Sequence, residues 1–423
     1  MKHTFLVVLI GLFSSICIPA YSQLAGTCEN AKTLGAKGDG TTDDTAAIQS
    51  AINQAQTSQI YTVCLPPGQY VINQPLVAAS GSLPGSYLTI VGSSSMWAYD
   101  ESTNSTTIIQ GPSWNAGSGQ NALINMLGAT QVRVENLQLH CTTSAPDGLD
   151  LGNAKFARVD QITVYGCNHG IYAQNGGLGI FSDNQVTNSS YGIELNGYGD
   201  AQLVGNYVNT NNTSYTPTAY NDLFGTGIYI TTGSDNVNIV GGKVEWNARG
   251  IVVYASQGVN ISSIQFDTNM AGHIFAYADF ATTAGTFNTR SITITGNRFL
   301  GGGQNDASGG AGPYHRAAII VDARASTKAN VVITGNSFRA GAECAFDNNT
   351  GSNCGTSGPV DTAIYVDELQ SGIANVVVTG NDLMDSSSTD AIIANGSGAT
   401  VKFTGNLTDL PTSALGGAVI TTP

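Results

Sequence analysis

The sequence predicts an all-β fold, a parallel β-solenoid in which short strands stack along one long axis. Ten short segments share one pattern: an apolar residue, two spacers, an Asn or apolar residue, one spacer and a further apolar residue. Most copies are 22 to 25 residues apart, and they are rich in Val, Ile, Gly and Asn without helical periodicity. A repeat of this length and composition is typical of one solenoid turn. The copies start at residues 134, 159, 181, 203, 239, 261, 294, 333, 378 and 403.

The first 22 residues predict a secretory signal peptide. Lys2 is followed by an apolar run from Phe5 to Phe13, and small residues precede Gln23. No later stretch reaches the ~20 apolar residues that a membrane-spanning helix requires. We therefore expect a secreted protein, extracellular or periplasmic, with no membrane contact after the signal is removed.

The charge balance argues against a nucleic acid partner. The chain has 15 Lys and Arg against 29 Asp and Glu, whereas nucleic acid binding needs a cationic surface. A polyanionic glycan is also disfavoured unless a cation such as Ca²⁺ mediates its binding. Whether the protein is a monomer or a homo-oligomer is left open by the sequence.

The cysteines predict disulfide bonds. One of the seven, Cys17, lies in the signal peptide, which leaves an even number in an oxidising compartment. Cys141 and Cys167 each come shortly after a copy of the repeated pattern, so they are expected on neighbouring rungs. Neighbouring rungs lie ~4.8 Å apart, a separation that a disulfide can bridge. We pair Cys344 with Cys354 by proximity, and Cys28 with Cys64 because they remain. A metal site is the alternative, but no Cys/His spacing supports it.

Residues 23–75 predict an N-terminal cap. A glycine-rich turn over 34–45 precedes a short helical segment whose Ala46, Ile48, Ala51 and Ile52 form one apolar face, and residues 63–72 read as strand, turn and strand. Because the end of a solenoid exposes its core, a capping helix is expected there. The regular rungs extend from about 130 to 410 in a single domain, 23–423.

The cap resembles the opening of the pectate-lyase-like superfamily. Its segment Gly35–Gln49 has the form Gly-Ala-x-Gly-Asp-Gly-x-x-Asp-Asp-Thr-x-Ala-Ile-Gln, and Leu65–Tyr70 has the form Leu-Pro-Pro-Gly-x-Tyr. The resemblance implies a right-handed parallel β-helix, here of about ten rungs, with a capping helix. The superfamily includes pectin and alginate lyases, polygalacturonases, glucanases, epimerases and phage tailspikes, so the resemblance does not select one reaction.

A second strand, of the form small-Ile-x-apolar, recurs in each rung. The residue between its two apolar positions must point outward. Insertions lie mainly at the turn before this strand, which favours a cleft beside it, although they can also be tolerated surface loops. The outward column is Asp150, Tyr172, Glu194, Tyr229, Val252 and Ile274.

This column predicts a catalytic site. Asp150 and Glu194 are two rungs apart, ~9.6 Å at ~4.8 Å per rung, so their carboxyl groups can approach the ~6.5–9.5 Å of an inverting glycosidase. Asp147 and His169 precede the small residue on successive rungs and add to the same patch. The alternative is an ordinary surface of acids and tyrosines. The side chains expected to orient or stack on sugars are Tyr172, Tyr229 and Tyr254.

The segment Ala145–Asp150 resembles the polygalacturonase motif Asn-Thr-Asp-Gly-x-Asp, which implies that Asp147 and Asp150 stand at acidic active-site positions. The resemblance stops there. Asn168-His169 replaces paired aspartates, Ser190-Tyr191-Gly192 replaces Gly-His-Gly, and Tyr229-Ile230-Thr231 replaces an Arg-x-Lys clamp. These departures argue against a true polygalacturonase and against a uronate at that subsite.

A second candidate pair is Glu245 and Asp267. They occupy equivalent positions on adjacent rungs, and a ~4.8 Å spacing suits a retaining carboxylate pair. Lys243 lies two residues before Glu245, so the alternative is a surface salt-bridge cluster of little energetic weight.

Taken together, these patterns predict a secreted glycoside hydrolase that cleaves a polysaccharide without a cofactor. The first alternative is a polysaccharide lyase or epimerase acting on a uronate-containing glycan, for which His315 and Arg316 supply cationic groups and Ca²⁺ is a potential cofactor. The second alternative is a non-catalytic, glycan-binding adhesin.

Overall fold

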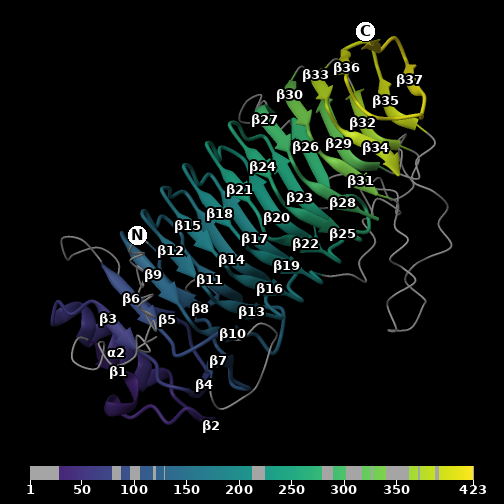
Figure 1. Ribbon diagram of the computed structural model, residues 1–423. Coiled ribbons are helices and arrows are strands. Elements are labelled where there is room, and N and C mark those ends of the chain that lie inside the picture. The colour runs from purple at the N-terminus through teal and green to yellow at the C-terminus, as the bar shows by residue number, and fades with distance from the viewer. Residues whose placement is uncertain are drawn as a thin grey trace, which may run out of the picture.

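The computed structural model describes residues 28–78, 87–95, 105–117, 121–127, 129–211, 224–278, 289–301, 317–324, 327–339, 362–369, 372–385 and 390–422. These residues form an elongated stack of rungs (Figure 1) in which three parallel sheets run along the whole axis. The structure confirms a parallel β-helix.

Sheet A has 14 strands, and every neighbouring pair is parallel. In sheet order the strands are β1 (Glu29–Asn30), β3 (Thr62–Cys64), β6 (Leu88–Val91), β9 (Val132–Glu135), β12 (Arg158–Asp160), β15 (Ile180–Ser182), β18 (Gln202–Val204), β21 (Asn238–Val240), β24 (Asn260–Ser262), β27 (Thr289–Thr295), β30 (Lys328–Thr334), β33 (Ile373–Thr379), β36 (Ala399–Thr404) and β38 (Val419–Thr421).

Sheet B has 12 strands and follows sheet A in each rung. Its strands are β2 (Asp39–Asp43), β4 (Gly68–Ile72), β7 (Thr106–Gln110), β10 (Gln138–His140), β13 (Thr163–Tyr165), β16 (Gln185–Thr187), β19 (Tyr207–Asn209), β22 (Lys243–Glu245), β25 (Gln265–Asp267), β28 (Arg298–Leu300), β31 (Ser337–Arg339) and β34 (Asp382–Asp385).

Sheet C also has 12 strands and completes each rung. Its strands are β5 (Leu76–Val77), β8 (Ala122–Asn125), β11 (Asp147–Asp150), β14 (His169–Gln174), β17 (Tyr191–Asn196), β20 (Thr226–Thr231), β23 (Arg249–Tyr254), β26 (Ile274–Ala278), β29 (Ala317–Arg324), β32 (Thr362–Leu369), β35 (Asp390–Asn395) and β37 (Thr412–Leu415).

The repeated sequence pattern spans two strands, one in sheet A and one in sheet B, so each rung contains three strands. In Phe181-x-x-Asn184-x-Val186, Phe181 lies on β15 of sheet A and Val186 on β16 of sheet B. Asp183 between them has a φ of 52°, and this left-handed residue turns the chain sharply into the next sheet. The turn is so tight that two strands share one short pattern.

Asparagines at this turn form a buried ladder along the stack. The Asn184 Nδ2 donates to the Val159 carbonyl at 3.1 Å and to the Asn206 Oδ1 at 2.9 Å. The same bonds recur from Asn297 through Asn336 and Asn381 to Asn406. Each amide satisfies backbone groups that would otherwise be buried without partners, so this column has a structural role.

The interior of the stack is filled by one inward side chain after another in register. On sheet B, Val164, Val186, Val208 and Val244 are followed by the larger Phe266, Phe299 and Phe338. All are buried in one apolar core that extends through the described rungs. The ring centroids of Phe266 and Phe299 are 5.0 Å apart and those of Phe299 and Phe338 4.6 Å, so the aromatic residues stack as the rungs do.

The N-terminal end is closed by helix α2 (Thr45–Thr57), which follows the short 3₁₀ helix η1 (Ala31–Leu34). Ile48, Ala51, Ile52 and Ala55 of α2 are buried in the core. The strands of the cap belong to the sheets themselves, because β3, β4 and β5 pair with β6, β7 and β8. The rungs therefore begin well before residue 130 and exceed the expected ten, since long insertions between these first rungs hide the period in the sequence.

Two predicted disulfides are present. Cys28 and Cys64 are joined with their Cα atoms 5.8 Å apart, and Cys141 and Cys167 with theirs 5.0 Å apart. Cys344 and Cys354 lie outside the described residues. Disulfides are typical of proteins that reside in an oxidising compartment. In the described part of the chain, no helix has the length and apolar character needed to cross a membrane.

Candidate active site on the outer face of sheet C

The outward column of sheet C is in register as predicted over its first strands. Asp150 pairs with Tyr172, Tyr172 with Glu194, and Glu194 with Tyr229. The expected continuation to Ile274 is wrong, because Val252 pairs with Phe275 while Ile274 pairs with the inward Ile251. One extra residue after Gly272 shifts this rung relative to the repeated pattern.

A glycine is the second residue of five successive sheet C strands, β11, β14, β17, β20 and β23. A Cβ built on Gly170 would lie 2.1 Å from the Val186 Cγ1 and 2.8 Å from the Gly192 carbonyl oxygen. Glycine is therefore required where the chain passes from sheet B into sheet C at close approach to the next rung. The residues immediately before these glycines, Asp147, His169 and Tyr191, consequently lie in one column along the edge of the sheet.

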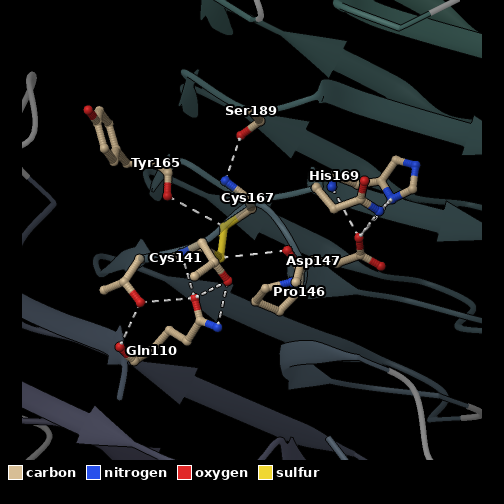
Figure 2. Close-up of a disulfide and its surroundings, with 12 residues drawn as sticks. Gln110, Cys141, Pro146, Asp147, Tyr165, Cys167, His169 and Ser189 are labelled. Atoms are coloured by element: carbon tan, nitrogen blue, oxygen red, sulfur yellow. Dashed lines mark hydrogen bonds and ion pairs between the residues drawn. A yellow bond between two sulfur atoms is a disulfide. The ribbon is translucent and has the colours of Figure 1, made fainter. Parts of the chain in front are cut away.

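His169 joins two carboxylates from neighbouring rungs. Its Nδ1 is 2.7 Å from the Asp147 Oδ1, and its Nε2 is 3.2 Å from the Glu194 Oε2. The His169 backbone N–H and the Asn168 Nδ2 also donate to the Asp147 Oδ1, each at 3.0 Å. Figure 2 shows Asp147 and His169 facing one another beside the Cys141–Cys167 disulfide. The three side chains thus form a continuous chain of hydrogen bonds across three rungs.

The imidazole of His169 is held as a cation. Burial lowers the pKa of His169, but its hydrogen bonds and charge interactions with Asp147 and Glu194 outweigh burial and raise the pKa to about 9. The ring also stacks on Tyr172 and on Tyr191, with centroids 4.7 and 4.9 Å apart. Aromatic faces favour a cation above them, so the tyrosines support the charged form.

Asp150 is fully buried, unlike the half-buried Asp147. Its Oδ1 accepts a hydrogen bond from the Gly152 N–H at 2.8 Å, while its Oδ2 has no hydrogen-bond partner. Burial raises the pKa of Asp150 to about 6, against the opposing effect of the Gly152 N–H, and the Asp147 charge adds to the increase. Asp150 therefore keeps its proton under mildly acidic conditions and can donate it.

The tyrosines predicted to bind sugar differ in accessibility. Tyr172 and Tyr229 are half-buried, whereas Tyr254 is nearly buried and pairs with the buried Tyr277. Burial raises the pKa of Tyr172, with the Glu194 charge adding to it, and burial also raises the pKa of Tyr229. Both hydroxyl groups are thus neutral hydrogen-bonding groups, and Tyr254 has little surface left for a sugar ring.

The second predicted pair lies on sheet B rather than beside the first site. Glu245 pairs in register with Asp267, and the Lys243 Nζ contacts the Glu245 Oε2 and lies 3.6 Å from the Asp267 Oδ2. Tyr207 donates to the Glu245 Oε1, and the Thr268 Oγ1 donates to the Asp267 Oδ1 at 2.8 Å. Both carboxylates are nearly buried, whereas the Lys243 side chain that joins them is half-buried, so the cluster is an ion-pair network at the surface of sheet B.

Tyr191 and Asn168 were not among the predicted site residues, although both contact the central histidine or its partner. Their register was the available signal, because Tyr191 occupies the position one rung beyond His169. His315 and Arg316 lie outside the described residues. Within the described ranges, no group of three His, Cys, Asp or Glu residues has the arrangement of a metal site.

The family was identified from the sequence of the N-terminal half. The sequence model described as "Rhamnogalacturonase A/epimerase, pectate lyase-like" matches residues 28–252, just over half of the chain. The chain belongs to this family. Membership confirms the right-handed parallel β-helix implied by the cap motif, and the match includes every strand that carries the sheet C site. The family description names carbohydrate-active enzymes, the general class expected from the sequence.

Individual relatives match over limited lengths. Non-secreted LysM effector LysM19 of Penicillium expansum is 26% identical over 189 residues, which are 39% of this chain and 14% of that protein. Alginate lyase 7 of Azotobacter vinelandii is 50% identical over 54 residues, 13% of this chain and 6% of that protein. This chain thus spans a small part of each relative.

The fold is shared more widely than the sequence. The crystal structure of the Agl-KA catalytic domain superposes with a TM-score of 0.65 at 15% identity and covers 94% of this chain and 68% of that one. A likeness at this identity establishes a common fold and leaves the reaction to be argued from the site.

Proposed function

We propose that this protein is a carbohydrate-active enzyme that hydrolyses a glycan on the outer face of sheet C. The observation that supports this most strongly is the pairing of two carboxyl groups in one column with different environments. Asp150 has a pKa raised to about 6 by burial and an oxygen without a partner, whereas Glu194 lies against the imidazolium of His169. Two carboxyl groups whose environments differ in this way are suited to opposite roles in acid–base catalysis.

In the proposed mechanism Asp150 is the general acid. Its proton passes to the glycosidic oxygen as the bond to the anomeric carbon breaks, and the Glu194 carboxylate takes a proton from the water that attacks that carbon. Asp150 and Glu194 are two rungs apart in register, ~9.6 Å between backbones at ~4.8 Å per rung. This span leaves room for the water of an inverting hydrolase.

Asp147, His169 and Tyr172 have positioning roles in this mechanism. His169 holds the Glu194 carboxylate through its Nε2, and Asp147 fixes the imidazole through its Nδ1. Tyr172 stands between Asp150 and Glu194 in register and stacks on His169. Because Asp150 is fully buried, we propose that the incoming sugar displaces the Tyr172 side chain to reach its Oδ2.

The charge of the site favours a neutral or weakly charged glycan. The cation of His169 already contacts two carboxylates, and Asp150 adds a third acid close by. A uronate carboxylate would therefore enter a site that is negative overall, which costs electrostatic energy. A lyase or epimerase is therefore our second candidate, because both need a group that neutralises the uronate.

A panel of plant, algal and bacterial polysaccharides tests the proposal. We expect new reducing ends without the ultraviolet absorbance of unsaturated uronates. We also expect Asp150→Asn to lose activity, while Asp160→Asn, which removes a sheet A carboxylate that accepts a hydrogen bond from Ser182, retains it. Absorbance that rises together with reducing ends would instead establish a lyase. No product on any glycan, with and without Ca²⁺, would contradict catalysis and favour an adhesin.

A further inference from the structure

The solvent exposure of the side chains on the outer face of sheet C changes sharply from one end of the stack to the other. Half-buried outward side chains lie on β11, β14 and β17, for example Asp147, Tyr172 and Tyr191. On β20 Tyr229 is half-buried, while Thr226 on the same outer face is fully buried. On the N-terminal side Asn125, which pairs with Asp150, is buried as well. The accessible part of this face therefore covers few rungs.

Beyond β20 the same face is closed. In the column of Asp150, Tyr172, Glu194 and Tyr229, only the two tyrosines are half-buried. Its continuation through Val252, Phe275, Ile320 and Tyr365 is buried at every position. The neighbouring column continues from Tyr254 through Tyr277 and two aspartates, which are also buried. Outward positions that could have bound further sugars are thus removed from solvent over four successive strands, β23, β26, β29 and β32.

The closed part is an apolar cluster distinct from the interior of the solenoid. We call it the outer cluster, and Tyr229 packs against it as its half-buried neighbour. A polar, accessible patch therefore ends directly at a buried apolar layer, with Tyr229 at the boundary. The members of the outer cluster are Val252, Tyr254, Ala255, Ala271, Phe275, Tyr277, Ala317, Ile320, Tyr365 and Ile393.

We propose that the glycan-binding face of sheet C ends at Tyr229, so that the enzyme binds the end of a glycan chain and removes short units from that end. This inference rests on the proposed function. The accessible face from β11 to β20 spans three inter-strand steps, ~14 Å at ~4.8 Å per step, which holds only a few sugar rings. A long chain lying along the axis cannot continue over Val252 and Phe275, because their surfaces are not available for contact.

Thiol labelling tests the boundary without requiring a substrate. Four single variants are compared with a maleimide reagent: Tyr229→Cys inside the accessible face, Val252→Cys beyond it, Val204→Cys on the exposed face of sheet A and Val208→Cys in the interior. We expect Tyr229→Cys to label as fast as Val204→Cys. We expect Val252→Cys to label about 100-fold more slowly, as Val208→Cys does, because a buried thiol reacts only after local opening.

The opposite labelling result would overturn the inference directly. If Val252→Cys labels as fast as Val204→Cys while circular dichroism shows a folded protein, the face continues beyond Tyr229 and a chain can pass along it. Three of the four variants replace valine by the similarly small cysteine, which keeps the comparison matched in size. This outcome is independent of whether any glycan is cleaved.

Product analysis then tests chain-end removal on any glycan of the panel that is cleaved. We expect short oligosaccharides from the first minutes, with little loss of viscosity for each reducing end formed. Products of many lengths with an early fall in viscosity would overturn removal from a chain end. The absence of cleavage on every glycan would overturn the proposed function and chain-end removal together, while labelling would still decide where the accessible face ends.

Discussion

Two clusters in this β-helix contain the same kinds of charged group but differ in the groups that can exchange protons. On sheet C, His169 lies between Asp147 and Glu194, and on sheet B, Lys243 lies between Glu245 and Asp267. Each cluster places one cation between two carboxylates that belong to different strands of the stack. In both clusters a tyrosine contacts a member, by stacking on His169 in one and by donating to Glu245 in the other.

The difference lies in which protons can move. The cation of sheet C is an imidazole with a pKa of about 9, and Asp150 with a pKa of about 6 lies near it. The sheet B cluster has a primary amine as its cation, and its carboxylates receive hydrogen bonds from Tyr207 and Thr268. A pair of stacked carboxylates is therefore not sufficient for the acid–base chemistry that we propose. Asp150, with a pKa raised to about 6, distinguishes the two clusters.

The strongest test of this contrast exchanges one carboxylate for an amide in each cluster. We expect Glu194→Gln to lower kcat/KM by about 10²–10⁴-fold, because a positioned acid or base contributes that much. We expect Glu245→Gln to change it by less than about 3-fold. Both variants are assayed on the same cleaved glycan at a temperature where both are folded. Equal losses in the two variants would show that the sheet B cluster also takes part in the reaction.

The pH dependence of activity tests whether the protonated Asp150 accounts for the difference between the two clusters. Because Asp150 must be protonated to donate, we expect kcat/KM to fall about tenfold per pH unit above pH 6. The pKa of His169 is about 9, so its charge is retained over this range. The measurement is kcat/KM from pH 4.5 to 8.5. A profile that stays flat from pH 6 to 8 would exclude Asp150 as the general acid.

Removing the cation should cost stability in both clusters, and more on sheet C. We expect His169→Ala to lower the free energy of unfolding at pH 6 by about 3–5 kcal/mol, since two largely buried carboxylates lose their partner. The raised pKa of His169 means that its contribution is complete below pH 6.5 and is lost as the pH rises through 9. Lys243 is more exposed, so Lys243→Ala should cost about 1–2 kcal/mol.

Urea unfolding at pH 6 and pH 9.5 measures both variants. The difference in free energy of unfolding between wild type and His169→Ala should be smaller at pH 9.5 than at pH 6. The corresponding difference for Lys243→Ala should be the same at both pH values. A His169→Ala penalty that does not depend on pH would mean that the imidazole acts through packing and not through its charge.

The remaining expected effect is a gain in stability at the proposed general acid. In the unfolded chain the carboxyl group of Asp150 ionises near its ordinary pKa of 3.8, and in the folded protein near 6. Stability is therefore lost as the pH rises from about 4 to 6. Asp150→Asn removes this loss and should raise the free energy of unfolding at pH 8 by about 1–3 kcal/mol. At pH 4 the variant should match the wild type, and lower stability at pH 8 would contradict the buried, proton-retaining carboxyl group.

The solenoid could be predicted from the sequence because inward residues must be apolar in every rung and therefore repeat along the chain. Val164, Val186 and Val208 are examples. The sequence was not sufficient for the number of strands per rung. The left-handed residue at 183 compresses the turn between sheets A and B into one short motif, so two strands read as one. The shift at Ile274 arose similarly, from one inserted residue that leaves the apolar pattern almost unchanged.

The sequence predicted where the candidate site lies, but it predicted only part of the chemistry of its residues. Register placed Asp147 beside His169 because equivalent positions stack, and it placed Glu194 in the adjacent column of the next strand, within reach of the imidazole. The protonation of Asp150 could not be predicted, because it depends on complete burial and on an oxygen without a partner, which the sequence does not record. The burial of the Glu245 and Asp267 side chains could not be predicted for the same reason.

The Cys141–Cys167 bond has a consequence for the conformational entropy of the unfolded chain. It closes a loop of the chain that contains Asp147 and Asp150 and ends two residues before His169. Once the bond has formed, these residues are confined to a small volume even in the unfolded chain. The bond thereby lowers the conformational entropy that must be lost when the proposed site residues are brought together.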